Sequence, residues 1–450
     1  MSSDFASQTA DLIDRAADAV ARARALGADA ATAHVRSSMA TSVSVRLGAL
    51  EDVGRSEERD LALTLYCGQR SASVSTADLS PAAIDALVER AVAMARIAPE
   101  NPWAGLAPEE ALMRGSLPDC DLADPSGEPD PERLRAMALA AEDAARAVPG
   151  VTNSEGGTAA ANSSAAALAT SHGFTGGVFA TGYSLSASVL AGEGDRMQRD
   201  YAWHSARYLA DLEGAEDIGT RAGVRAVARL DPALLPSGPM PVLFDPRVAG
   251  SLISHLTSGM SGPAIARGRS FLKTREGERL FPDTISIVED PLRRRGLRSR
   301  PFDGEGLPTR EGRLVDRGVI GGWLCDAASA RQLGRAPTGH ASGGGGVSTG
   351  NLILLPGSIS RDVLMADIAD GVLVTELIGQ GVDALTGDYS RGASGFRIRN
   401  GQLAEAVSGF TIAGNLITMF ADLRAANDLD TRGSVHVPTL RTDSLTVAGA

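Results

Sequence analysis

The sequence predicts an α+β fold, with a mixed α/β N-terminal domain followed by a β-rich, antiparallel C-terminal domain of barrel or sandwich type. In residues 1–230, helical and strand-like patterns mix without the strict strand–helix–strand alternation of a parallel sheet. Residues 231–241 hold four prolines, which favour a stiff, non-helical linker. In residues 242–450, glycine turns separate short β-rich segments, most regularly beyond Gly306.

Four helices are expected in the N-terminal domain. Residues 9–26 carry apolar side chains at helical spacing. Residues 81–97 begin with proline and follow Asp78 and Ser80, either of which can cap a helix. The other two helices are predicted at 131–148 and 211–230.

The strands of this domain are expected to be short and to carry small side chains. Alternation and β-branched residues predict strands at 31–35, 42–47, 61–67 and 71–75. Residues 150–194 are rich in Ser, Thr, Ala and Gly, and alternation within them indicates several more strands. Residues 98–131 are rich in Pro, Gly and Asp, so we expect a long surface loop there.

The C-terminal domain is expected to open with a strand and a helix. Residues 242–244 are apolar and β-rich. The Asp-Pro pair at 245–246 is typical of a helix start, and the helix should run to about residue 258. Farther on, the four glycines at 343–346 do not have GxGxxG spacing and precede no helix start, which argues against a dinucleotide site.

The most informative stretch of the chain is 371–401. Residues 372–377 alternate and predict a strand, and residues 396–398 predict the next one. The second strand is closed by Asn400-Gly401, a strong hairpin dipeptide. Glycines punctuate the residues between the two strands, and this density lets one backbone approach another closely.

Long segments of this stretch and its surroundings resemble the TldD/PmbA family. The resemblance is carried by TELIGQGV and TGDYSRGASGF, by FTIAGNL and NDLDTRGS after them, and by PFDGEGLPTREGRLVDRGVIGGWLCDAASARQLG and PTGHA before them. Within the family these segments are similar to the PmbA (TldE) branch rather than the TldD branch. The similarity covers nearly the whole chain, more weakly in its N-terminal half, and implies the same α+β and β-rich domains.

The resemblance also implies that the zinc site of the TldD branch is absent here. That branch is a zinc metallopeptidase whose HExxxH helix and a late cysteine supply ligands. The matching helix reads AGSLISHLTSGMSG, which places Ser254, His255 and Gly259 at the His, Glu and His positions. No cysteine follows Cys325, and Asp430, Thr431 and Arg432 lie near the position where that branch has its cysteine ligand. No catalytic residue, metal or other cofactor is therefore expected in this chain.

Composition excludes several classes of protein. The net charge of −12 argues against a nucleic-acid partner, which usually requires a basic face. The cysteines Cys67, Cys120 and Cys325 are far apart and form neither a disulfide framework nor a CxxC metal site, which favours a reducing cytoplasm. The N-terminus lacks the pattern of a secretory signal, and no apolar run is long enough to span a membrane. GxSxG and HExxH are also missing.

The glycine-rich stretch is the predicted peptide-binding surface. An exposed strand edge flanked by glycines can bind an extended peptide through main-chain hydrogen bonds. The candidate residues are Thr375, Glu376, Gly379, Gln380, Gly381, Asp388, Tyr389, Ser390, Arg391 and Gly392. The alternative is that Glu376 and Arg391 pair with each other inside the fold.

Other chemical side chains are interpreted more plainly. His255 lies on an apolar helix and is expected to be structural rather than a metal ligand. His340, beside the four-glycine loop, could touch substrate or a partner, but a polar loop residue is the favoured interpretation. His436 shows no visible partner. The carboxylates Asp303, Glu305 and Glu311 could act as acid and base, but a solvated turn is the favoured interpretation. The basic run 293–300 is likewise expected to be a solvated loop.

The resemblance therefore implies a cytoplasmic, non-catalytic PmbA/TldE-like subunit. It would assemble with a TldD-like sister that carries the zinc, and the complex would proteolyse unfolded or leader peptides. Two alternatives stay open. One is a stand-alone metallopeptidase with a non-standard site around His255 or His340. The other is a homodimeric peptide-binding or scaffold protein without a proteolytic role.

Overall fold

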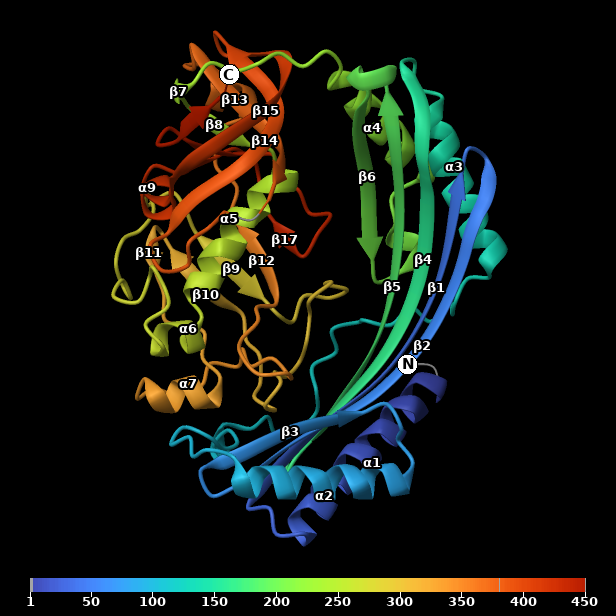
Figure 1. Cartoon of the computed structure of the whole chain (residues 1–450), viewed down its shortest axis with the longest axis vertical. Coiled ribbons are helices and arrows are strands. Elements are labelled where there is room, and N and C mark those ends of the chain that lie inside the picture. Colours follow the sequence, from blue (N-terminus) through green and yellow to red (C-terminus); the bar gives the residue numbers. More distant parts are fainter. Residues whose placement is uncertain (1–2, 380, 450) are drawn as a thin grey trace.

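The computed structural model describes residues 3–379 and 381–449. Figure 1 shows a long, curved N-terminal sheet along one side of the molecule and a β-rich C-terminal region beside it. Helices and sheets mix as the α+β prediction requires, and the C-terminal region is built mainly from strands.

The N-terminal sheet has six antiparallel strands in the order β3-β2-β1-β4-β5-β6. They are β1 (Ala30–Arg46), β2 (Ala49–Cys67), β3 (Arg70–Thr76), β4 (Val151–Thr170), β5 (Thr175–Ala191) and β6 (Gln198–Ala206). The prediction of separate strands at 31–35 and 42–47 was wrong. The residues between them continue the ladder with both β2 and β4, so β1 is one long strand. Its polar middle concealed this continuity in the sequence.

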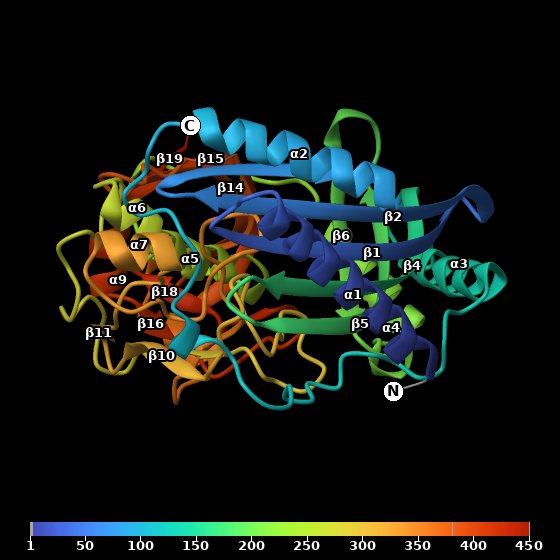
Figure 2. The ribbon, with the colours of Figure 1, turned by 90° about the horizontal axis from the view of Figure 1, so that it is seen from below.

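All four helices of this region cover the same face of the sheet. They are α1 (Ser3–Ala25), α2 (Pro81–Ile97), α3 (Pro131–Arg146) and α4 (Ala215–Ala228). Ala33 and Val35 of β1 are buried in the core with α1 and α2, while Val43 and Val45 are buried in the core with α3 and α4. Side chains two residues apart share a face of a strand, so both cores lie on one side. Figure 2 shows α1 and α2 from that side.

The opposite face of the sheet is turned toward the C-terminal region (Figure 1). The short turns η2 (Gly194–Arg196) and η3 (Leu209–Asp211) flank β6 at the edge of the sheet. No helix in the described ranges has the length and apolar character needed to cross a membrane.

The segment predicted as a surface loop at 98–131 is irregular, with one short turn, η1 (Glu109–Ala111). It is not simply a surface loop, because Leu112 is buried in a cluster with Leu307 and Ala327 of the C-terminal region. The guanidinium of Arg331 also donates hydrogen bonds to three backbone carbonyls of this segment, those of Trp103, Gly105 and Leu106, at 2.7–2.9 Å. The segment therefore fastens the two regions together.

The C-terminal region contains two open sheets. The larger has the order β16-β18-β8-β13-β14-β15-β19-β7 and the smaller β11-β10-β9-β12-β17. Neither sheet closes, so the barrel alternative does not apply. Both sheets contribute to one hydrophobic core, which also contains the apolar side of α5. The strand predicted at 242–244 and the helix start at 245–246 are confirmed.

The strands of these sheets are β7 (Gly238–Pro239), β8 (Val242–Phe244), β9 (Ile287–Asp290), β10 (Gly312–Asp316), β11 (Val319–Ile320), β12 (Asn351–Leu354), β13 (Asp370–Ile378), β14 (Asp388–Arg399), β15 (Gln402–Asn415), β16 (Arg424–Ala425), β17 (Val435–His436), β18 (Leu440–Thr442) and β19 (Thr446–Ala448). The helices are α5 (Pro246–Gly259), α6 (Gly262–Ala266), α7 (Ala327–Gln332), α8 (Arg361–Met365) and α9 (Leu416–Ala421). The proline-rich segment 231–241 is non-helical, and Ala233 and β7 within it pair with strands of the larger sheet.

The basic run 293–300 is partly the solvated loop that its composition suggested, because Arg294, Arg295 and Arg298 are exposed, but two of these arginines also make long-range ion pairs. Arg294 and Arg295 both pair with Asp121, at 3.1 and 2.8 Å, and Arg295 also pairs with Asp211 at 3.0 Å. Both carboxylates belong to the N-terminal region, so these arginines join the two regions. The sequence hides this role because the partners are far away along the chain.

Candidate functional site

Helix α5 is placed against the larger sheet by its caps and its apolar side. Asp245 accepts a hydrogen bond from the backbone N–H of Arg247 at 3.1 Å, which satisfies one free donor of the first turn. Leu252, Ile253 and Leu256 are buried in the C-terminal core. This packing brings the helix that carries the degenerate zinc motif alongside β13 and β14.

The residues present at the motif do not fit a zinc ion. Ser254 is exposed, and its hydroxyl donates to the carbonyl of Gly250 at 3.1 Å. A Cβ at Gly259 would lie 2.8 Å from Phe271 and 2.9 Å from Leu272, so these two side chains fill the space that a ligand would need. Only His255 offers a nitrogen, whereas catalytic zinc sites use three protein ligands.

Residues 430–432, where the TldD branch has its cysteine ligand, form a different interaction here. Arg432 and Asp430 form an ion pair there, with Nε 2.9 Å from Oδ1. In the ranges 3–379 and 381–449, no three His, Cys, Asp or Glu side chains gather closely enough to hold a metal ion.

His255 of the motif forms an aromatic pair with the buried Tyr389. Their rings meet edge to face with centroids 6.1 Å apart. Within the described residues, His255 Nε2 and Tyr389 Oη are buried and lack a hydrogen-bond partner. Burial and the nearby charge of Arg391 lower the pKa of His255, and burial raises the pKa of Tyr389. Both rings are therefore neutral near pH 7.

Tyr389 thus lies in the core rather than on the predicted peptide-binding surface. It is 1 % exposed. Since its ring fills a space between α5 and β14, removing it would disturb the packing of the sheet as well as any bound peptide. Arg391, two residues along the same strand, is the more accessible probe of this surface.

The strand edge predicted for peptide binding is short. β13 pairs with β14 along most of its length, but its other side pairs with β8 only at Val372–Val374. After Phe244 the neighbouring chain turns into α5. In the described residues, the segment 375–378 therefore has a strand partner on one side only. Thr375 of this segment is buried, and its end at Ile378 is exposed.

The remaining candidate residues lie around the end of this segment. Gly379 has a positive φ of 75°, which favours glycine. The backbone of Gly381 approaches that of Ser390, whose N–H donates to the Gly381 carbonyl at 2.6 Å, so no side chain fits at residue 381. Gln380 lies outside the described residues.

The last two candidates differ in exposure. Asp388 is exposed and accepts hydrogen bonds from Thr386 at 2.8 Å and Asn415 at 3.0 Å. Gly392 lies inside β14, opposite Ile378, whereas the sequence predicted this strand only at 396–398. Glycine in a strand allows close approach as well as turning, and the sequence pattern cannot separate the two.

A recess of about 310 Å³ lies between β6, α5 and the free segment of β13. Its charged lining residues are Arg199, Asp200, Arg229, Arg247, Glu376 and Arg391. Asp200 is 1 % exposed and receives the guanidinium of Arg247 at 2.8 Å and that of Arg229 at 3.4 Å. The sequence did not single out these three residues, because they come from β6, the end of α4 and the start of α5.

Glu376 does not pair with Arg391, as the alternative interpretation had it. It pairs with Arg229, which lies just after α4 and is brought next to β13 by the packing of the two regions. Arg391 instead makes a long hydrogen bond from Nε to the carbonyl of Ile378, at 3.4 Å.

The open face of the N-terminal sheet borders this recess. A hollow of about 640 Å³ on it shares Arg199 and Tyr201 with the recess. Hydroxyl side chains line it, together with Tyr201 and Trp203, which are 41 % and 45 % exposed. The hydroxyl residues are Thr158, Ser184, Ser186 and Ser188. The serine- and alanine-rich pattern of residues 150–194 therefore forms a polar surface of small side chains on the open face of the sheet, which we call the polar wall.

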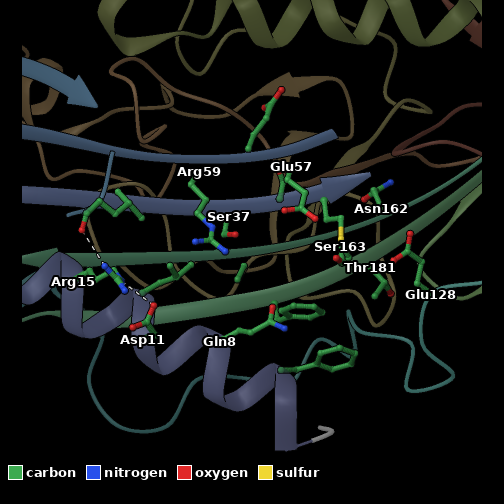
Figure 3. A pocket seen from close by; sticks show the side chains of 18 of the residues that line it. Gln8, Asp11, Arg15, Ser37, Glu57, Arg59, Glu128, Asn162, Ser163 and Thr181 are labelled. Carbon is green, nitrogen blue, oxygen red and sulfur yellow. Dashed lines mark hydrogen bonds and ion pairs between the residues drawn. The ribbon is translucent and has the colours of Figure 1, made fainter. Parts of the chain in front are cut away.

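Figure 3 shows a separate cavity, of about 860 Å³, between α1 and the sheet. Arg15 in it pairs with Asp11 at 2.8 Å and donates to the carbonyl of Leu79 at 3.0 Å. Its other polar lining residues include Gln8, Ser37, Glu57, Arg59, Glu128, Ser163 and Thr181. In the sequence, this cavity corresponds to polar residues such as Ser37, Glu57 and Arg59 on the helix-facing side of β1 and β2. On β1 they separate the apolar residues that pack on α1 and α2 from those that pack on α3 and α4.

His340 is more than a polar loop residue. Its Nε2 lies 2.7 Å from Oε2 of Glu289, which is 2 % exposed, and its Nδ1 lies 2.8 Å from the Thr338 hydroxyl. His436 likewise has a partner, because Arg293 Nη1 donates to its Nδ1 at 2.7 Å. Both histidines are held in structural hydrogen bonds.

The acidic cluster is not a solvated turn as predicted. Asp303 is 2 % exposed and accepts three backbone hydrogen bonds at 2.9–3.0 Å, which fix the loop around it. Glu305 accepts from the backbone N–H of Ala327 at 2.9 Å, and burial raises its pKa to about 8. Of the three carboxylates, only Glu311 is exposed. Gly304 and Gly306 allow this loop to fold inward, whereas the pattern suggested a surface turn.

Replacing Gly259 with Ala should lower the free energy of unfolding by about 1–3 kcal/mol, because the new Cβ would overlap Phe271 and Leu272. Urea unfolding of the purified protein measures the change. Gly312→Ala is the matched control, since nothing lies within 4 Å of a Cβ there. Equal stability of the two variants would contradict the packing described at Gly259.

Family models match most of the chain. The PmbA/TldA metallopeptidase domain 1, central domain and C-terminal domain match residues 37–95, 124–230 and 237–449. "Metalloprotease PmbA" of Escherichia coli O157:H7 is 36 % identical over 422 residues, which cover 94 % of this chain and 92 % of the relative. "Metalloprotease PmbA homolog" of Haemophilus influenzae is 34 % identical over 91 % of this chain and 90 % of its own.

Solved structures share the fold over almost the whole chain. A putative modulator of DNA gyrase from Bacteroides thetaiotaomicron has a TM-score of 0.90 and 28 % identity, covering 97 % of this chain and 98 % of its own. TldE from Thermococcus kodakarensis has a TM-score of 0.84 and 19 % identity, covering 97 % and 100 %. The chain therefore belongs to the PmbA/TldD metallopeptidase family.

Proposed function

We propose that this chain is the non-catalytic, PmbA/TldE-like subunit of a cytoplasmic metallopeptidase complex that cleaves unfolded or leader peptides. A TldD-like sister subunit would carry the zinc. The observation behind this proposal is the state of α5. The three motif positions hold Ser254, His255 and Gly259, and the packing of Phe271 and Leu272 leaves no room for a ligand at the third. The relatives named metalloproteases support the reaction class.

In this proposal a zinc ion held by the sister would polarise the scissile carbonyl and activate water. This chain contributes binding instead. The free side of residues 375–378 can pair with the main chain of an extended peptide, which needs no particular sequence. Most backbone groups of a folded protein are already paired, whereas an unstructured chain has its backbone groups free to pair with this edge. The expected substrates are therefore unstructured chains.

The polar wall beside the recess supports the same role. Small hydroxyl side chains offer hydrogen bonds without deep apolar pockets, so they hold many sequences weakly. Tyr201 and Trp203 add exposed rings at the edge of this wall, where apolar side chains of a peptide can pack.

Cleavage of an unstructured, fluorogenic peptide tests the proposal. It is measured with this chain alone, with a TldD-like sister alone, and with the mixture, each with and without a chelator. We expect cleavage to be strongest in the mixture, to be abolished by chelator, and to be absent with this chain alone. Light scattering of the mixture should show a complex of both chains.

Two results would replace the proposal with its rivals. Chelator-sensitive cleavage by this chain alone would indicate a stand-alone metallopeptidase with a site around His255 or His340. Stable self-association, with no affinity for the sister and no effect on its cleavage, would indicate a homodimeric scaffold protein.

A further inference from the structure

Among the described residues, the recess between β6, α5 and β13 has one positive charge without a carboxylate partner. Three of its four arginines form ion pairs within the described ranges, and one does not. Arg199 pairs with Glu155 at 3.2 Å, Arg229 with Glu376, and Arg247 with Asp200 at 2.8 Å. The fourth is Arg391.

Arg391 is left without a carboxylate among the described residues. Its one described hydrogen bond is the 3.4 Å contact from Nε to a backbone carbonyl, so both terminal nitrogens of its guanidinium keep free donors. The side chain is half-buried and lines the recess. Its charge reaches the surroundings, since it helps to lower the pKa of His255.

The position of Arg391 relative to β13 is fixed by strand pairing. Gly392 lies opposite Ile378, so Arg391 stands next to the end of the free segment 375–378. A planar guanidinium can grip a carboxylate through two parallel hydrogen bonds. The volume of the recess, about 310 Å³, lies at the lower end of the range for small-ligand sites, roughly 300–1,000 Å³.

We propose that this recess binds the free α-carboxylate of an extended peptide, with Arg391 as the residue that contacts it. The inference rests on the proposed peptide-handling function and names the part of the substrate that is recognised. The free strand edge would pair with the main chain of the peptide. The α-carboxylate is attached directly to that main chain, at its C-terminal end. The side-chain carboxylate of Asp or Glu offers the same chemistry but stands one or two methylene groups away from it.

Binding of matched peptides to the purified chain tests this assignment. The probes are one unstructured ten-residue Ala/Ser/Gly peptide with a free C-terminus, the same peptide with a C-terminal amide, and an amidated peptide that ends in Glu. Fluorescence anisotropy gives each Kd at pH 7. We expect the free acid to bind about tenfold more tightly than either amide, as a charge-assisted, two-point contact implies.

Variants then assign the effect to one side chain. Arg391→Gln should bind acid and amide equally, while Arg391→Lys should keep part of the preference because it keeps the charge. Arg310→Gln is the matched control, since Arg310 is an exposed arginine outside the recess, and it should behave as wild type. Circular dichroism and thermal denaturation check that each variant is folded.

Several outcomes would overturn the assignment. They are equal binding of acid and amide by the wild type, no binding of the acid, or an acid preference that survives in Arg391→Gln. Tight binding of the Glu-ended amide alone would show that the site takes a side-chain carboxylate. An Arg391-dependent acid preference without cleavage by any mixture would leave this site standing and refute the proposed peptidase complex. Cleavage by the mixture without an acid preference would support the peptidase complex and refute the carboxylate site.

Discussion

Replacing Asp200 with Ala should lower the free energy of unfolding by about 3–5 kcal/mol, because it leaves the largely buried Arg247 without its main partner. Asp200 is 1 % exposed and holds Arg247 at 2.8 Å and Arg229 at 3.4 Å. Arg229 would keep Glu376 as a partner. Arg247 would keep only Asp245, whose carboxylate lies 3.8 Å from its Nε.

The effect should also loosen the contact between the two regions of the chain. Asp200 belongs to β6, whereas Arg247 opens α5, so the ion pair joins the N-terminal sheet to the helix of the degenerate motif. Urea unfolding followed by tryptophan fluorescence measures the loss. Trp203, on β6, and Trp323, in the C-terminal core, report on both regions.

Glu155→Ala provides the matched control for Asp200. Glu155 pairs with Arg199, the residue next to Asp200. Both side chains of this pair are close to half-exposed, at 44 % for Glu155 and 47 % for Arg199. Exposed pairs contribute less than about 1 kcal/mol. If Asp200→Ala costs no more than Glu155→Ala, then the Asp200 network is not the stabilising contact that its burial implies.

Replacing Glu305 with Gln should make the protein more stable at pH 8 and flatten its dependence on pH. Burial, with smaller effects of Asp303 and Asp326, raises the pKa of Glu305 from its ordinary 4.5 to about 8. Between these values the folded protein keeps a proton that the unfolded chain releases. Stability therefore falls as pH rises through this window, by at most about 1.4 kcal/mol per pH unit.

A glutamine at this position is neutral at every pH, and its carbonyl can still accept the hydrogen bond from Ala327. Relative to wild type, Glu305→Gln should gain on the order of 3 kcal/mol between pH 4.5 and pH 8. Urea unfolding at several pH values measures the difference. Glu311→Gln, at an exposed carboxylate of the same segment, should leave the wild-type pH dependence unchanged. Parallel curves for wild type and Glu305→Gln would mean that this carboxyl is ionised in the folded protein.

Local patterns in the sequence were sufficient where the structure is set by neighbouring residues. The helix predicted at 81–97 matches α2 in both bounds, because Ser80 caps it and Pro81 fits its first turn. The strand at 242–244 and the helix after Asp245 follow from the same kind of signal. The lack of an HExxxH sequence on α5 could also be read directly, since it depends only on which side chains the helix carries.

Long-range pairing was beyond these patterns. The sequence suggested Glu376 and Arg391 as partners, 15 residues apart, yet Glu376 pairs with Arg229, which is 147 residues away. Asp303 and Glu305 looked solvated beside glycines, but the loop that they occupy is covered by residues around Ala327 and Ala341. Charge and turn propensity are local properties, whereas burial depends on what packs on top.

The sequence by itself determined the family, the mixed fold, the main helices and the lack of a complete zinc motif. Each of these depends on residue identity at short spacing, which survives without knowledge of the fold. Only the tertiary structure decided that β1 is one strand, that Tyr389 is a core residue, and that Arg391 is the unbalanced charge of the recess. Those properties arise from which strands and helices meet, and a partner far along the chain leaves no local trace.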